Sequence, residues 1–214
     1  YLKELVSADM LKRISGTSGD YTLGSKIAVL DFISHRTDPL VQISIPFMRD
    51  IVERTELFCL LTYLNHDYCI DLHHENFKDS ELLSFGRGCP RPVYIGASPK
   101  IMIADLSKQR IQGYYQQFSA EIAEVGFAQS LEEFIQHMRK IKKQGFYLSQ
   151  GEIDPLVCGL SVPIRFSNKE APIALTLVAS KNRFDFLNMQ KLIEILQDNA
   201  AQIEHKFTTL AETA

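Results

Sequence analysis

Ser98 follows a run of small residues at the start of a predicted helix, and no other segment of the chain is better suited to bind a ligand. The stretch is Tyr94-Ile-Gly-Ala-Ser-Pro-Lys-Ile-Met-Ile-Ala-Asp-Leu106. Ser98 is suited to cap the helix and Pro99 to occupy its first position. The first backbone N–H groups of a helix have no partner within it and carry partial positive charge. The segment therefore predicts a pocket for a carboxylate or another acceptor; the alternative is an ordinary capped helix that binds nothing.

Charged and aromatic side chains surround this segment in the sequence. Arg87 and Arg91 flank the preceding loop and are placed to pair with a carboxylate; the alternative is that both are solvated surface charges. Phe85, Tyr94 and Leu160 would instead shape a site for an aromatic ring. The sequence therefore favours a small acid or an aromatic acid as the ligand class.

The cysteines and histidines have neither the spacing of a metal site nor that of a catalytic pair. The four cysteines are widely separated, without a C-x-x-C pair, and we interpret them as free thiols: Cys59, Cys69, Cys89 and Cys158. Neighbouring residues of a strand point to opposite faces, so the adjacent His73 and His74 could not easily share a metal. A cysteine nucleophile needs a base, and nothing in the spacing pairs Cys158 with a candidate among His66, His73, His74 and His137. We therefore predict no enzyme, no metal and no cofactor.

The bulk composition is ordinary for a soluble globular protein. The chain has 214 residues, of which 45% are hydrophobic and 23% are charged. Its net charge is −3 and its pI is near 6.1, so the chain as a whole lacks the basic character typical of nucleic-acid binding. No apolar run approaches the ~18 residues that span a membrane, and no signal peptide is evident. We therefore expect a cytoplasmic protein.

Residues 1–24 predict a helix followed by a β-hairpin around a Gly-rich turn. This is the order of the second half of a winged helix-turn-helix; the alternative is a plain αββ fragment. The segment has no net charge, because Lys3, Lys12 and Arg13 are balanced by Glu4, Asp9 and Asp20. Since the helical pattern already begins at Tyr1, we expect the chain to be N-terminally incomplete.

Helices and strands alternate through the rest of the chain. Asp38 followed by Pro39 is a helix-start signal, and Ser130 with Glu133 forms a capping box. Gly145 is a natural helix end. The predicted helices cover residues 25–36, 39–55, 98–106, a short piece from 107, 130–144 and 186–207. The predicted strands cover 57–64, 68–74, 82–85, 157–164 and 173–178, with a turn at 167–170. About five strands among helices indicate an α+β fold.

Four segments, in this order, resemble motifs of the IclR (isocitrate lyase regulator) family of bacterial transcription factors. Tyr21-Thr-Leu-Gly24 resembles the family's Y-x-L-G at the end of the wing. Pro92-Val-Tyr-Ile-Gly-Ala-Ser-Pro-Lys100 with Ile103-Ala104 is similar to P-L-H-A-T-A-x-G-K-x-x-L-A. Gly145-Phe-Tyr with Glu152 resembles G-Y-A…E, and Gly159-Leu-Ser-Val-Pro-Ile164 resembles G-x-A-A-P-V. The chain departs from the family at Tyr94, Pro99 and Ala179-Ser180, where His, Gly and Gly-Pro are common.

The resemblance implies a GAF-like effector-binding domain with a central antiparallel sheet flanked by helices. It would be preceded by the C-terminal part of a winged helix-turn-helix and a linker helix, with boundaries at 1–24, 25–38 and 39–214. The function implied is a ligand-responsive DNA-binding transcriptional regulator, by default a repressor. Its partners would be double-stranded operator DNA, a small carboxylate or aromatic acid as effector, and further copies in a homodimer or homotetramer. Two alternatives are a stand-alone sensing or oligomerisation module and an enzyme on a GAF-like fold.

The resemblance also assigns residues to the effector pocket, position by position. They are Ala97, Ser98, Ser149, Gln150, Val157, Gly159, Ser161, Thr176 and Val178. Strand alternation supports the assignment, because residues 157, 159 and 161 share one face, as do 176 and 178. Ser161 and Thr176 place hydroxyls on that face; the alternative is that these hydroxyls bond to backbone within the core. For DNA contact the candidates are Lys3, Lys12 and Arg13.

Overall fold

The computed structural model describes residues 1–16, 19–77, 85–166 and 172–213. The chain divides into two compact units, Tyr1–Gln42 and Ile43–Ala214. The turn predicted at 167–170 and most of the strand predicted at 82–85 lie outside the described residues, and Phe85 belongs to no strand. None of the described helices is both long enough and apolar enough to cross a membrane.

The first unit has the helix–hairpin–helix order that the sequence predicts. Its elements are α1 (Leu2–Ser7), β1 (Leu11–Arg13), β2 (Tyr21–Leu23) and α2 (Ser25–Thr37). The hairpin is antiparallel, with Lys12 opposite Thr22. Gly24 joins the hairpin to α2, and a Cβ at this position would lie 2.0 Å from the carbonyl oxygen of Asp9. Only glycine fits so close an approach of two backbone segments.

A long helix, α3 (Pro39–Thr55), begins in the first unit and continues into the second. Asp38 caps it as predicted, because its Oδ1 accepts the backbone N–H groups of Leu40 at 2.8 Å and Val41 at 3.2 Å.

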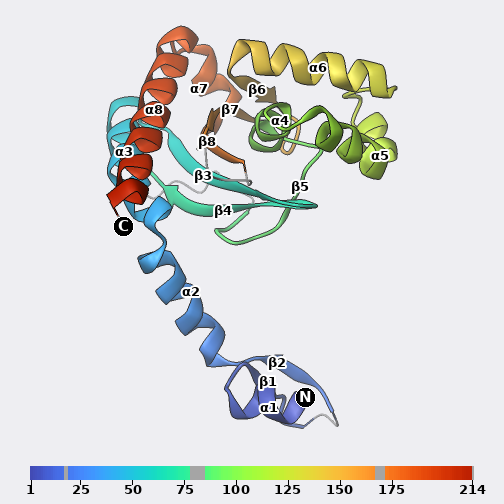
Figure 1. The fold of residues 1–214 in the computed structure, drawn as a ribbon, viewed down its shortest axis with the longest axis vertical. Coiled ribbons are helices and arrows are strands. Elements are labelled where there is room, and N and C mark those ends of the chain that lie inside the picture. The colour runs from blue at the N-terminus through green and yellow to red at the C-terminus, as the bar shows by residue number, and fades with distance from the viewer. Residues whose placement is uncertain (17–18, 78–84, 167–171, 214) are drawn as a thin grey trace. The chain divides into compact units, whose positions relative to one another are not determined.

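In the residues that the structure describes, the second unit is built on a six-stranded antiparallel sheet (Figure 1). The strand order is β5-β4-β3-β8-β7-β6. The strands are β3 (Phe58–Asn65), β4 (Tyr68–Glu75), β5 (Arg91–Pro92), β6 (Tyr147–Gln150), β7 (Val157–Ile164) and β8 (Ile173–Ser180). The central strands β3, β7 and β8 are buried along almost their whole length, which matches their nearly continuous apolar sequences.

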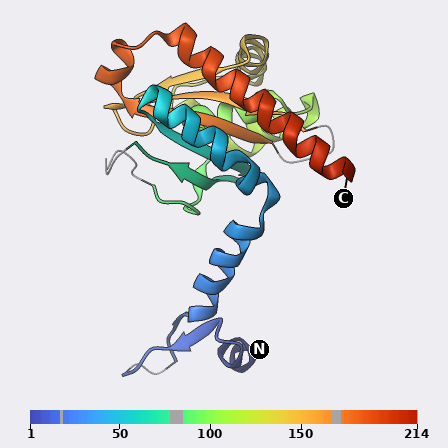
Figure 2. The same cartoon turned by 90° about the vertical axis from the view of Figure 1, so that its left-hand side faces the viewer.

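Helices cover both faces of this sheet. On one face α4 (Ala97–Ala104) contacts β3, β6, β7 and β8, and α5 (Lys108–Glu124) and α6 (Leu131–Gln144) pack beyond it. On the other face α8 (Met189–Thr213) crosses β7 and β8, after the short helix α7 (Lys181–Asp185). Figure 2 shows α3 alongside α8, where the ammonium of Lys206 lies 5.4 Å from the centre of the Phe47 ring.

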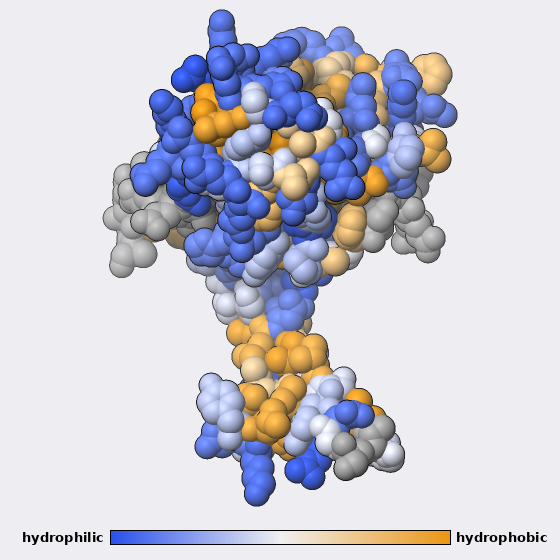
Figure 3. All heavy atoms as spheres, turned by 90° about the vertical axis from the view of Figure 1, so that its right-hand side faces the viewer, coloured by the Kyte–Doolittle hydropathy of each residue, from blue (hydrophilic) through white to orange (hydrophobic). Residues whose placement is uncertain are grey.

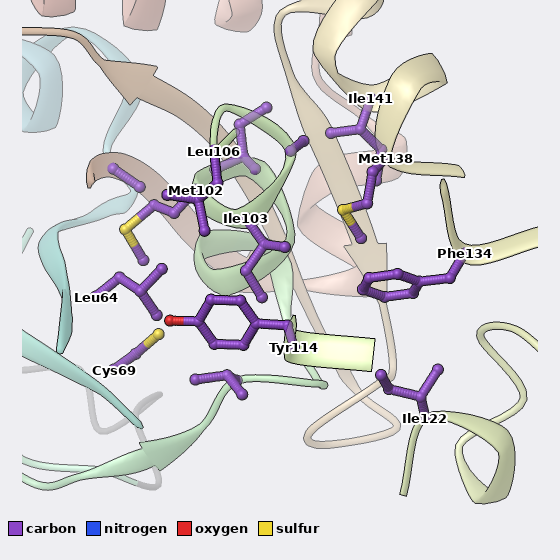
Figure 4. Close-up of a cluster of buried hydrophobic side chains, with 14 of the residues drawn as sticks. Leu64, Cys69, Met102, Ile103, Leu106, Tyr114, Ile122, Phe134, Met138 and Ile141 are labelled. Carbon is purple, nitrogen blue, oxygen red and sulfur yellow. The ribbon is translucent and has the colours of Figure 1, made fainter. Parts of the chain in front are cut away.

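One hydrophobic core lies between α4, α5 and α6 and the sheet (Figure 4). α6 contributes Phe134, Met138 and Ile141, three of the five residues on the apolar face that helical periodicity predicts; Leu131 and Ile135 are only partly buried. Both ends of α6 form as expected: Ser130 accepts the N–H of Glu133 at 3.2 Å, and Gly145 ends the helix with φ of 73°. All eight residues of α4 are buried, and the helix lies packed between α6 and the sheet.

Several elements differ from their predictions. The short helix expected from residue 107 is the 17-residue α5, and the short strands β5 and β6 were not expected. Ser98 is not a cap, because α4 begins at Ala97 with Gly96 in the N-cap position at φ of 90°. Glycine adopts a positive φ at little cost, so Gly96 lets the preceding loop turn directly into α4. The Ser98 side chain is thus released for contacts with the sheet.

Candidate ligand-binding cavity

A cavity of about 60 Å³ lies between the N-terminus of α4 and the sheet. By that measure it has room for roughly four to six water molecules, or a small organic ligand. Residues from β3, β4, β5, β6, β7, β8 and α4 contribute to its wall, together with Ile153 and Asp154 from the segment between β6 and β7. The cavity therefore lies where the central strands and the start of α4 meet.

Most of the residues predicted for the effector pocket border this one cavity. They are Ala97, Ser98, Ser149, Val157, Gly159, Thr176 and Val178. Strand register explains the convergence, because Gly159 lies opposite Ser149 in β6 and opposite Val178 in β8. Ser161 is fully buried behind Thr176 and does not border the cavity. Gln150 is exposed on β6 and does not border it either.

A chain of hydroxyl groups connects α4 to the sheet beside the cavity. The Ser98 and Thr176 hydroxyl oxygens are 2.9 Å apart, and those of Thr176 and Ser161 are 2.7 Å apart. Ser161 also lies 3.5 Å from the carbonyl oxygen of Leu175. The hydroxyls of Ser161 and Thr176 therefore bond chiefly to other side chains rather than to backbone.

Asp71 is a buried acceptor at one end of the cavity. Its carboxylate accepts the Thr62 hydroxyl at 2.7 Å, pairs with the Arg91 guanidinium, and lies 3.1 Å from Nε2 of His74. Burial disfavours the charged form and on its own would raise the pKa of Asp71. The His74 hydrogen bond, the Arg91 charge and the Thr62 hydrogen bond together outweigh burial and lower that pKa. Asp71 is therefore an anion at neutral pH.

A β-bulge brings Asp71 to the cavity face of the sheet. Leu61 pairs with His73, but the next residue of β3, Thr62, pairs with Asp71, so Leu72 is the extra residue of β4. Without the bulge, alternation would place His74 and Asp71 on opposite faces. Asp71 is not among the residues predicted from the sequence, although an acidic residue within a largely apolar strand is a signal that could have identified it.

A buried ion pair holds the segment after β6 against α4. Lys100 pairs with Glu152, and its ammonium lies 4.1 Å from the centre of the Phe127 ring. The Glu152 carboxylate also accepts the N–H of Gly96 at 2.8 Å and the hydroxyl of Tyr147 at 3.0 Å. Burial lowers the pKa of Lys100, and the charge and hydrogen bond of Glu152 oppose that change. These contacts fix both the N-cap of α4 and the segment that carries Ile153.

The described residues offer no catalytic or metal-binding arrangement at this cavity. Cys158 borders it, but burial raises the pKa of its thiol, and no described histidine is hydrogen-bonded to it. The adjacent histidines have separate partners: His73 bonds to Glu75, and His74 to Asp71. Among the parts of the chain that the structure describes, no three His, Cys, Asp or Glu residues cluster in a way that could hold a metal ion.

Comparison with known proteins identifies relatives of this fold. The family described as Bacterial transcriptional regulator IclR C-terminal matches residues 34–205. The HTH-type transcriptional regulator KipR of Bacillus subtilis (strain 168) is 21% identical over 192 residues, which cover 88% of this chain and 76% of KipR.

Two solved structures of IclR proteins have a similar fold. One is an IclR homolog from Microbacterium hydrocarbonoxydans complexed with 4-hydroxybenzoate (TM-score 0.76, 21% identity, 97% of this chain and 83% of that chain). The other is IclR of Thermotoga maritima (TM-score 0.77, 16% identity, 96% and 82%). The family and these relatives are transcriptional regulators, not enzymes. The family match covers most of the residues, and the chain belongs to the IclR family of bacterial transcriptional regulators.

Proposed function

We propose that this chain is a cytoplasmic, DNA-binding repressor whose DNA affinity is changed by a small organic acid bound in the cavity. The observation that carries the proposal is the cavity itself, which unites seven residues assigned to an effector site from the sequence. A ligand that binds one arrangement of the protein better than another shifts the population toward that arrangement. In this proposal, binding of the acid lowers the affinity for DNA and so relieves repression.

The start of α4 supports an acid as the effector. α4 presents the N–H groups of Ala97 and Ser98, for which the described residues provide no acceptor, next to the cavity. Unpaired N–H groups at a helix start favour a carboxylate. The structural relative from Microbacterium hydrocarbonoxydans is complexed with 4-hydroxybenzoate, an aromatic acid. In this proposal the cavity-lining residues contact the effector, and Ser161 positions the Thr176 hydroxyl from behind.

The first unit supports the DNA-binding part of the proposal. We infer that residues 1–24 are the C-terminal part of a winged helix-turn-helix, with β1 and β2 as its wing, and that residues 25–38 are a linker before the effector domain at 39–214. Lys3, Lys12 and Arg13 are exposed on this unit and are the proposed DNA contacts. Arg13 extends over the Tyr21 ring, 5.9 Å from its centre, and remains free to reach a phosphate.

The exposed surface of α2 supports a homodimer or homotetramer. α2 has no buried residue, and its exposed apolar side chains are Val29, Leu30, Phe32 and Ile33. Figure 3 shows apolar surface gathered on this part of the chain. Contiguous exposed apolar side chains mark interaction sites on soluble proteins. A second copy would cover them, in keeping with the paired half-sites that helix-turn-helix regulators commonly read.

Effector binding is tested by thermal unfolding in the presence of short-chain and aromatic monocarboxylates. A ligand at about 100 times its Kd stabilises the folded state by ~2.7 kcal/mol, which raises the Tm of a domain of this size by roughly 5–10 °C. Ser98→Ala and Thr176→Ala should each weaken binding about 3- to 10-fold through loss of one hydrogen bond. Thr209→Ala, exposed on α8, is the matched control and should bind normally. A panel without any shift contradicts the effector proposal.

DNA binding is tested by fluorescence anisotropy with a mixed-sequence duplex at 50 and 200 mM salt. Each lost phosphate contact reduces the slope of log K against log salt by about 0.9. Lys12→Ala/Arg13→Ala should therefore reduce the slope by about 1.8 and weaken binding at both salt concentrations. The matched control is Lys140→Ala/Lys143→Ala, exposed on α6. Equal slopes for the two double variants would rule out the hairpin as a DNA contact.

A further inference from the structure

Arg91 is a buried cation with unused hydrogen-bond donors at the edge of the cavity. Its side chain is 8% exposed, and it borders the cavity from β5. A guanidinium carries five N–H donors, but among the described residues Arg91 bonds only to Asp71, through Nη2. Nε is fully buried and has no acceptor among them. A buried donor without a partner is uncommon in folded proteins and calls for an acceptor.

The hydroxyl groups beside the cavity cannot replace this cation as the main contact for an anion. The hydroxyls of Ser98, Thr176 and Ser161 have three protons, and the two bonds between them use two. The third proton points from Ser161 to the Leu175 carbonyl, or toward the cavity from Ser98 or from Thr176, depending on the direction of the two bonds. Thr62 gives its single proton to the Asp71 carboxylate at 2.7 Å. The hydroxyls therefore supply a ligand with one donor at most.

Two carboxylates of the described residues, those of Asp71 and Asp154, border the cavity and limit the charge of the ligand. Asp71 is already paired with Arg91 and accepts from Thr62, so its charge is largely balanced. Among the described residues, the Asp154 carboxylate accepts only the N–H of Leu156, at 2.9 Å, and pairs with no cation, so its negative charge is not balanced. A second negative charge on the ligand would be repelled by Asp154. The apolar wall, which includes Leu60, Val157 and Val178, suits the body of the ligand.

We propose that Arg91 is the specificity-determining residue of the cavity and that the effector is a monocarboxylate whose carboxylate binds its guanidinium. This inference rests on the proposed effector-binding function and names the charged contact within it. The N–H groups at the start of α4 lie on the same side of the sheet, since Ser98 is within 3.3 Å of Thr62, which bonds to Asp71. Guanidinium and helix start together would bind the two carboxylate oxygens, while the apolar end of the acid fills the rest of the cavity.

The test compares each acid with its uncharged amide. Isothermal titration calorimetry is carried out with butanoate and butanamide, and with 4-hydroxybenzoate and 4-hydroxybenzamide. A buried charge-assisted contact should give the wild-type protein a preference of about 30-fold or more for the acid that binds. Arg91→Lys keeps a cation to pair with Asp71 but loses the planar fork that can serve two carboxylates at once. Its acid-to-amide ratio should fall to within about 3-fold, mainly through weaker binding of the acid.

The controls separate this inference from the proposed function. Arg87→Lys, an exposed residue ahead of Arg91, should keep the wild-type ratio. Arg91→Met should lose the preference for acid over amide, as Arg91→Lys does. The Met variant leaves Asp71 without a cation and could fail to fold. The Lys variant keeps that cation, so the test does not depend on the Met variant. An Arg91→Lys protein that still prefers the acid, or a wild type that binds acid and amide alike, overturns the inference while effector binding stands. Failure of all four compounds to bind the wild type overturns both.

Discussion

Asp71→Ala is expected to lower the free energy of unfolding by about 3–5 kcal/mol, which is the usual result of removing one partner of a buried ion pair. Asp71 is 3% exposed and accepts from Thr62, Arg91 and His74. Without it the Arg91 guanidinium remains buried with no counter-charge. Urea unfolding followed by far-UV circular dichroism measures the loss, since the chain has no tryptophan to report by fluorescence.

The matched control for Asp71 is an exposed ion pair. Asp50 and Arg54 are 2.9 Å apart on α3 and about half exposed, so Asp50→Ala should change stability by less than ~1 kcal/mol. Asp71→Ala/Arg91→Met removes both buried charges and should recover part of the lost stability. Equal losses for Asp50→Ala and Asp71→Ala would contradict a buried charge network at the cavity.

The contribution of Asp71 should also depend on pH in a fixed direction. The pKa of Asp71 is lowered in the folded protein, so the unfolded chain takes up the proton first as pH falls. The stabilisation is therefore complete above the ordinary carboxyl pKa of about 4 and is lost as pH falls below it, through the folded value. The stability difference between wild type and Asp71→Asn should accordingly shrink below about pH 4.

Gly159→Val is expected to lower the affinity for the effector by about 100-fold or more while leaving the protein folded. A Cβ at Gly159 would lie 3.3 Å from the Ser149 hydroxyl oxygen and 3.4 Å from the Ala97 methyl. Its methyl groups would occupy the cavity where Gly159 forms the wall. Overpacking costs about 1–3 kcal/mol, within the stability of a typical domain. Thermal unfolding gives the stability, and calorimetry with the acid that binds wild type gives the affinity.

Two glycine variants calibrate this result. Gly159→Ala adds one carbon and should weaken binding by less than Gly159→Val. Gly113→Ala in α5, where an added Cβ has nothing within 4 Å, should leave binding unchanged and stabilise the helix slightly. Normal affinity in Gly159→Val would place the effector elsewhere on the chain.

Local sequence signals were sufficient for the elements whose stability is local. The α6 helix is an example, because its cap at Ser130, its apolar stripe and its terminal Gly145 all act within one segment. The strand at Val157–Ile164 was predicted with its observed bounds, since its apolar run has no helical period. β5 and β6 were not predicted, because strands of two and four residues carry almost no pattern and exist only through pairing with β4 and β7.

Part of the cavity wall could be predicted, because strand alternation and motif order are also local features of the sequence. Residues 157 and 159 share a face by alternation, as do 176 and 178, and the resemblance to the IclR family located the start of α4 beside them. The prediction that Ser98 caps the helix is wrong. The sequence does not reveal that Gly96 adopts a positive φ as the N-cap, so that α4 begins at Ala97, one residue before Ser98. Its contact with Thr176 spans 78 residues of sequence, beyond any local signal.

The sequence by itself determined the family, the order of the longer elements and four of the strands that border the cavity, β3, β4, β7 and β8, because these depend on local patterns and on motif order. The tertiary structure alone decided the charges at the cavity. The bulge at Leu72 brings Asp71 to the face that carries Thr62, and pairing of β4 with β5 brings Arg91 beside Asp71. A one-residue change of register reverses which face a side chain joins, and long-range pairing sets that register.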